Sequence, residues 1–168
     1  EQIFSQALVA LGATMATYTA QNFGAGKMSR IKQGTRCAVN IGITICAITF
    51  VCLSFFSEQL VAIFMSEANN EIIYLGSMYL HIIMIFMIFL AILLIFRNIL
   101  QGMGQAMAPL MSGVAELVLR GASALVLGHF FGFLGICFAT PAAWIGASIV
   151  LFSGYKLSLL KRLKSLRK

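Results

Sequence analysis

Glu116 and Arg120 carry opposite charges and stand four positions apart inside an apolar stretch. On a helix this spacing puts both side chains on one face, with the acid on the N-terminal side, so that carboxylate and guanidinium can pair. An unpaired charge near the middle of a membrane-spanning helix costs about 2.5–3.5 kcal/mol on insertion scales, so charges there are functional candidates. The pair predicts either an internal ion pair that fixes its helix in a bundle or a gate or coupling pair facing a water-filled cavity.

His81 is the third candidate for transport or coupling, and it lies in another apolar stretch. Histidine changes its charge near physiological pH, so a proton relay is one interpretation. A neutral ring bonded to a neighbouring helix is the other. The methionines and phenylalanines around it favour either a promiscuous apolar site or ordinary packing. These residues are Met78, Met84, Phe86, Met87 and Phe89.

Soluble-enzyme chemistry finds no support in this sequence. The chain has no Asp, no phosphate-cradling glycine loop and no HExxH motif. Its four cysteines have neither CxxC spacing nor a histidine at ligand spacing, and we expect them to behave as small hydrophobic residues. We therefore expect no enzyme, no catalytic residue, no cofactor and no metal site. The four are Cys37, Cys46, Cys52 and Cys137.

Long apolar segments must position these residues. The 168 residues are 60% hydrophobic and only 10% charged, whereas a soluble domain carries about 25% charged residues. Such segments cross a hydrocarbon core of about 30 Å as helices, because backbone groups in lipid must satisfy one another. We predict an all-α, polytopic membrane helical bundle of about five transmembrane helices over residues 1–155, followed by a basic tail over 156–168. The segments are residues 3–20, 37–56, 72–96, 110–131 and 134–155.

Basic residues alternate between the connections of these segments. The first connection is rich in Lys and Arg, the third begins with Arg97, and the tail is strongly basic. The second and fourth connections contain no Lys or Arg, and the charged residues of the second are all Glu. The positive-inside rule then predicts a cytoplasmic C-terminus, with the tail near anionic membrane lipids. We expect the plasma (inner) membrane as the location. This placement argues against nucleic acid as the partner of the net charge of +7. Five crossings without a signal-peptide pattern favour a piece of a longer chain.

Several stretches resemble one transporter family. Residues 20–27, Ala-Gln-Asn-Phe-Gly-Ala-Gly-Lys, with Gly34 further on, are similar to the AQNxGAGK…G signature of MATE (multidrug and toxic compound extrusion) transporters. Residues 100–104, then Pro109 and Glu116 with Arg120, and residues 140–144 resemble later motifs of the family. The resemblance gives some motif residues a structural role. They are Gln21, Asn22, Gly24, Gly26, Gln101, Gly102, Pro109 and Pro141.

The resemblance implies two six-helix lobes that face each other across a cavity. The five segments would be the eighth to twelfth helices, a partial C-terminal lobe whose N-terminal lobe is missing. It also implies secondary-active antiport, with drugs or organic cations exported in exchange for H⁺ or Na⁺. Some members carry a cation-binding carboxylate on the tenth helix, yet residues 72–96 contain no acid, so coupling falls to the missing part or to Glu116.

Two other functions stay open. The first is a lipid-linked oligosaccharide flippase of related architecture, which several basic residues in the cavity would favour. From the sequence, only Arg120 is expected to lie deep in the membrane. The second is a non-transporting membrane scaffold or truncated remnant.

Overall fold

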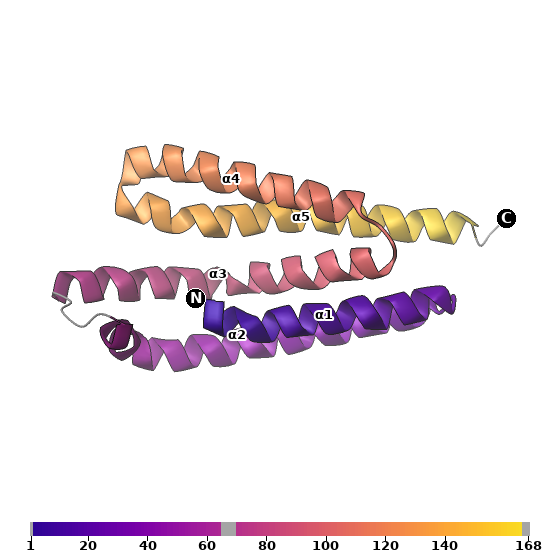
Figure 1. Ribbon diagram of the computed structural model, residues 1–168, viewed down its shortest axis with the longest axis horizontal. Helices are drawn as coiled ribbons and strands as arrows, with labels where there is room; N and C mark the ends of the chain where they lie inside the picture. The colour runs from indigo at the N-terminus through magenta and orange to yellow at the C-terminus, as the bar shows by residue number, and fades with distance from the viewer. Residues whose placement is uncertain (1, 65–69, 166–168) are drawn as a thin grey trace.

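The computed structural model describes residues 2–64 and 70–165, and almost all of them are helical (Figure 1). No strand occurs in these two ranges. The predicted all-α class is therefore confirmed. The helices are α1 (Gln2–Gly24), α2 (Met28–Phe64), α3 (Asn70–Gly102), α4 (Met107–Phe131) and α5 (Phe133–Ser165).

The helices extend beyond the apolar segments that predict them. Residues 37–56 mark only the middle of α2, which begins at Met28 and includes basic residues in its first turns. Likewise, α5 continues to Ser165 through the first part of the basic tail. Hydropathy marks the part of a helix that lies in hydrocarbon, whereas backbone hydrogen bonding continues into the headgroup region. Glu1, Glu67 and the last three residues lie outside the described ranges.

Four of these helices are long and apolar enough to cross a membrane. The helix that falls short in apolar character is α1, although its 23 residues would be about 34 Å long at 1.5 Å per residue. Glutamine, threonine and asparagine side chains interrupt its apolar sequence, and it lies against α2 and α3. A helix covered by protein on part of its surface needs fewer apolar residues than one surrounded by lipid.

The central helix is α3, which contacts each of the other four. It contributes much of the buried core, including Ile83, Met87 and Ile99. Helices α1 and α2 pack on one side of it, and the hairpin of α4 and α5 packs on the other (Figure 1). Within the described ranges, α4 packs mainly on α5, touches α3 little and does not contact α1 or α2.

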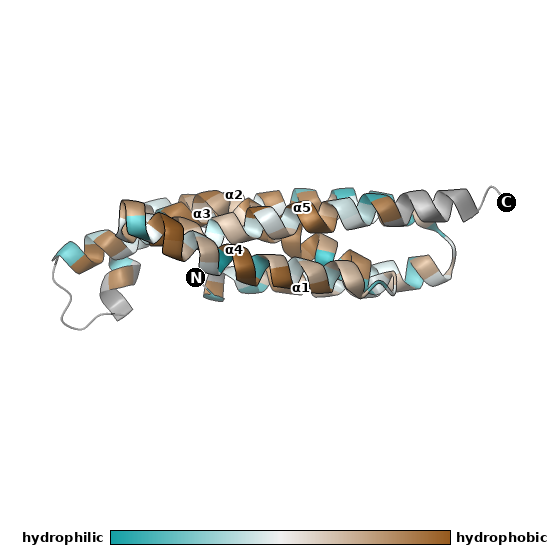
Figure 2. Ribbon diagram, turned by 90° about the horizontal axis from the view of Figure 1, so that it is seen from above, coloured by the Kyte–Doolittle hydropathy of each residue, from teal (hydrophilic) through white to brown (hydrophobic). Residues whose placement is uncertain are grey.

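Much of the outer surface is apolar. Figure 2 shows apolar residues along the helices, interrupted by paler and hydrophilic ones. Large side chains such as Ile48, Phe55 and Leu125 are exposed. An exposed apolar surface of this extent would aggregate in water, whereas lipid accommodates it because the helices satisfy their own backbone groups. The protein is therefore an integral membrane protein.

The turn after α1 and the turn after α3 have the same backbone conformation and hydrogen bonding. Gly26 after α1 and Gly104 after α3 have φ angles of 70° and 74°, which favour glycine because it has no Cβ. The next N–H closes each turn: Lys27 donates to Asn22 O at 2.8 Å, and Gln105 donates to Leu100 O at 2.9 Å. This is the Schellman arrangement that ends a helix, and it explains why the motif needs Gly26.

Glycine also sets the distance between α1 and α3. A Cβ added to Gly102 would lie 2.5 Å from Ala16 O, and one added to Gly12 would lie 2.7 Å from Asn98 Nδ2. Small residues let helix backbones approach in this way in membranes. The two contacts fasten α1 to the half of α3 that carries the charged site described below.

We predict that Gly102→Ala destabilises the protein, because the new methyl group must push α1 away from α3. Overpacking of this kind costs about 1–3 kcal/mol. The matched control is Gly121→Ala in α4, where an added Cβ meets nothing within 4 Å and helix propensity favours alanine. Unfolding by SDS in mixed micelles measures both variants. Equal stability of the two variants would contradict the packing role of Gly102.

Candidate functional site

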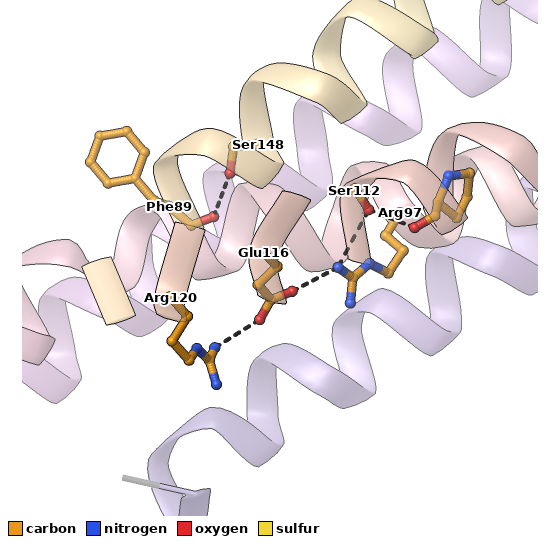
Figure 3. A network of polar contacts seen from close by, with 7 residues as sticks. Phe89, Arg97, Ser112, Glu116, Arg120 and Ser148 are labelled. Carbon is orange, nitrogen blue, oxygen red and sulfur yellow. Dashed lines mark hydrogen bonds and ion pairs between the residues drawn. The ribbon is translucent and has the colours of Figure 1, made fainter. Parts of the chain in front are cut away.

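A cluster of three charged side chains joins α3 to α4. Arg97 Nη2 lies 2.9 Å from Glu116 Oε2, and Arg120 Nη2 lies 2.8 Å from Glu116 Oε1. Figure 3 shows Glu116 between the two arginines. Each carboxylate oxygen therefore accepts from a different guanidinium group. Two positive charges share one negative charge, so the cluster carries a net charge of +1.

The structure brings Glu116 and Arg120 together, as their spacing predicts. The expectation that Arg97 lies in a connection between helices is wrong. The sequence places Arg97 at the start of a connection, whereas it lies inside α3, which ends at Gly102. The helix continues because Ile99 and Leu100, both 0% exposed, pack in the core beyond the charge. That pair of apolar residues after Arg97 is the signal that could have found the third member of the cluster.

Arg97 is more enclosed than Arg120. Their side chains are 25% and 48% exposed, and that of Glu116 is 22% exposed. A longer contact of 3.4 Å joins Arg97 Nη2 to Ser112 Oγ, which itself donates to Pro109 O at 2.7 Å. The buried Nε of Arg97 has no hydrogen-bond partner among the described residues. Arg97 thus forms an ion pair with Glu116, while its Nε–H remains unpaired among the described residues.

A cavity of about 840 Å³ lies beside this cluster, where the turn between α3 and α4 begins. Arg97 and Gln101 form part of its wall from α3, and Pro109, Leu110, Val114 and Leu117 form part of it from α4. Ligand pockets for drug-sized molecules typically measure about 300–1,000 Å³ and are mostly apolar with a few polar groups. The cavity falls in this size range and is mostly apolar, and it is widely open to the outside.

The depth of the cluster decides which side of α4 can face lipid. Arg120 lies about 20 Å along α4 from Met107, near the middle of a helix about 37 Å long. Charged groups at such depth face protein or a water-filled cavity. None of the described contacts joins α4 to α1 across this side, although Figure 2 shows both helices on the same side of α3. We therefore expect the charged side of α4 to be an internal face, turned toward protein or water rather than lipid.

His81 does not belong to the cluster. It lies on α3 about 24 Å from Arg97 along the helix axis. Its Nδ1 donates to Ser77 O of the same helix at 2.8 Å, and its side chain is half-buried. Of the apolar residues near it, Met84 and Met87 are buried in the core. Phe86 instead lines a separate apolar cavity of about 420 Å³ between α3, α4 and α5.

The motif residues near the first turn differ in their contacts. Asn22 is buried and donates from Nδ2 to Tyr18 O at 2.8 Å. Gln21 and Lys27 both line a polar cavity of about 500 Å³. Gly26 has the positive φ angle described above. A Cβ on Gly24 would meet nothing within 4 Å, so packing does not explain that glycine.

The later motif residues surround the charged site or stabilise α5. Gln101 is exposed and lines the cavity, and Gly102 packs on α1. Pro109 is buried in the first turn of α4, where its missing N–H leaves no donor unpaired. Pro141 is fully buried inside α5, where neighbouring helices offset the lost hydrogen bond.

Long apolar helices with a charged cluster between two of them are typical of helical membrane transport proteins. The MatE family model matches residues 1–126 of the 168. The chain therefore belongs to the MATE family and is a MATE-type transporter rather than a member of an enzyme family. The matched range includes Arg97, Glu116 and Arg120. No curated protein and no solved structure matches the chain.

We predict that Glu116 is coupled more strongly to Arg97 than to Arg120. Arg97 is the more enclosed partner, and its bond connects two helices. Double-mutant cycles with Arg97→Gln, Arg120→Gln and Glu116→Gln, measured by SDS unfolding, should give about 0.5–3 kcal/mol for residues that share a network. The half-exposed pair on α4 should stay near the 0.3–0.5 kcal/mol that is typical of surface helix pairs. The reverse order would show that Arg97 does not hold α4 to α3.

Proposed function

We propose that the protein is a secondary-active antiporter that exports drugs or organic cations in exchange for H⁺ or Na⁺. The observation that carries this proposal is the Arg97–Glu116–Arg120 cluster on the internal face of α4, beside a cavity of drug size. Membership of the MATE family supports the transport class.

The geometry suggests how ion binding would move a helix. Both oxygens of Glu116 are occupied by guanidinium groups, so a proton or Na⁺ that arrives there weakens at least one ion pair. Arg120 shares a helix with Glu116, but Arg97 belongs to α3. Loss of the Arg97 bond removes a polar link between two helices that otherwise touch little. Ion binding at Glu116 would thereby allow α4 to move relative to α3.

The charged site would lie between two lobes in the membrane. The internal face of α4 would meet an N-terminal lobe of the same transporter across the cavity. Residues 1–155 would form the transmembrane bundle, and residues 156–168 would form a cytoplasmic tail near lipid headgroups at the plasma membrane. Lys156 begins that tail, with its Nζ 4.6 Å from the centre of the Phe152 ring, as expected of a long cationic side chain at an interface.

One observation favours a second candidate function, a flippase for lipid-linked oligosaccharides. The sequence alone puts one arginine deep in the bundle, but the structure adds Arg97 to Arg120 in the same cluster. Two guanidinium groups in one cluster, of which Arg97 lines the cavity, suit a substrate with phosphate groups. The match to the MatE family supports a MATE-type transporter in general.

We predict that Glu116→Gln causes a partial loss of drug efflux in cells that express the protein from its complete gene. The amide keeps the size of the side chain but cannot carry the coupling charge or hold both arginines as ion pairs. Dye efflux across a range of external pH and Na⁺ measures the loss. His81→Gln serves as a comparison, because His81 is a separate candidate for a proton relay. Unchanged efflux in Glu116→Gln would remove this residue from the coupling role.

We also predict that water reaches the internal face of α4. In a variant whose four native cysteines are replaced by serine, Leu117→Cys should react with a membrane-impermeant maleimide in membranes opened on both sides. Ile48→Cys is the matched control, because that side chain is also exposed but belongs to α2, which does not contact α4. Equal labelling of the two positions, or none at Leu117→Cys, would show that this face is not a transport pathway.

A further inference from the structure

We propose that the seam between α1 and α2 binds one anionic phospholipid. The headgroup phosphate occupies the polar cavity that Lys27 and Arg30 line, and an acyl chain occupies the apolar groove that adjoins this cavity along both helices. This inference goes beyond the proposed transport function and does not depend on it.

The polar cavity lies at the turn between α1 and α2 and has a volume of about 500 Å³. Lys27 and Arg30 bring positive charge to its wall, and the amides of Gln21 and Gln33 bring further hydrogen-bond donors. Residues 2–57 of the sequence contain no Asp or Glu, and the ion pairs formed among the described residues include neither basic side chain. A cavity with two cations and no neighbouring acid favours an anion such as phosphate.

An apolar groove of about 380 Å³ lies along the same two helices. From Tyr18 to Leu11 it extends about 10 Å along α1, toward the middle of that helix. Its wall is mostly apolar and includes Met15, Ala38 and Ile41. The groove exists because α1 and α2 pack on each other less than either packs on α3. An acyl chain needs apolar contact alone, and this seam offers it within the hydrocarbon layer.

Tyr18 and Gln33 line both the polar cavity and the apolar groove, so the two adjoin. The Tyr18 hydroxyl donates to Arg30 O at 3.1 Å. Its ring lies against Gly34, where an added Cβ would clash with it. Tyrosine is typical of the boundary between headgroups and hydrocarbon. A phospholipid has the same order of parts, a phosphate followed by an acyl chain, whereas a soluble phosphate would leave the groove without an occupant.

The site lies at the end of the bundle where the basic residues gather. The turn between α1 and α2 shares this end with the turn between α3 and α4 and with the C-terminal end of α5 (Figure 1). Glu71 begins α3 at the opposite end. Lys and Arg residues close to a membrane surface attract anionic lipids. The position along the helices therefore suits a headgroup in the cavity and an acyl chain that extends into the membrane.

A matched pair of lipids tests the headgroup. Dioleoyl phosphatidylglycerol is an anion, and dioleoyl phosphatidylcholine has the same chains and a phosphate but no net charge. Native mass spectrometry of the delipidated protein, expressed from its complete gene, gives the affinity of the tightest site for each lipid. We expect phosphatidylglycerol to bind about tenfold more tightly, because each basic residue near the surface favours an anionic lipid. Equal affinities would overturn the inference.

Removal of the basic residues locates the preference. With Lys27→Gln and Arg30→Gln combined, the affinity for phosphatidylglycerol should fall about tenfold, and that for phosphatidylcholine should change little. The matched control combines Lys32→Gln with Arg36→Gln, which removes the same charge from exposed positions of α2 that line neither the cavity nor the groove. Equal losses in the two double variants would show that net charge alone attracts the lipid, and the site would be rejected.

A bulky side chain in the groove tests the place of the acyl chain. Cys37 is exposed and lines the groove, so Cys37→Trp should weaken the binding of dioleoyl phosphatidylglycerol about tenfold by taking the place of apolar contacts. Cys52→Trp is the matched control, because Cys52 is also exposed on α2 but does not line the groove. Ile41→Trp repeats the test if circular dichroism shows that Cys37→Trp does not fold. Unchanged binding in a folded groove variant would contradict the assignment.

A soluble phosphate is the other source of the same chemistry. Incubation with millimolar inorganic phosphate, before transfer to the volatile buffer, should leave phosphatidylglycerol bound, because inorganic phosphate makes no use of the groove. Displacement of the lipid would assign the polar cavity to a soluble anion and overturn the lipid site.

Discussion

A charged side chain in the middle of a membrane needs a partner, and this requirement organises the structure around Glu116. One carboxylate is shared by arginines from two helices, at 2.9 Å and 2.8 Å. Because Arg120 lies midway along α4 and its side chain is half exposed, we expect its side of α4 to face protein or water rather than lipid. The ion pair with Arg97 turns the Glu116 side of α4 toward α3. The apolar side chains on the rest of the helix are free to meet lipid or the facing half of a transporter.

The packing divides the described helices into a tight part and a looser part. Glycines at positions 12 and 102 bring α1 against α3 at backbone distance, and the Gly146 backbone similarly lies against Leu119, so that α5 holds α4. Between α3 and α4 there is little direct packing. The ion pair between Arg97 and Glu116 connects these two helices instead. Dispersion contacts change little with ion binding, whereas an ion pair responds directly to a change of charge. The polar link therefore lies where movement would be useful.

Sequence reasoning found what depends on local pattern and missed what depends on distant contacts. Apolar segments predicted five helices in the right order, and a spacing of four residues predicted that Glu116 and Arg120 face each other. Arg97 was missed because it is nineteen positions from Glu116 and because hydropathy falls at a charge while the helix continues. The start of α2 at Met28 was missed for the same reason. The turn at Gly104 depends on a backbone conformation that composition does not reveal, and the separation of His81 from the cluster follows from its distance along α3.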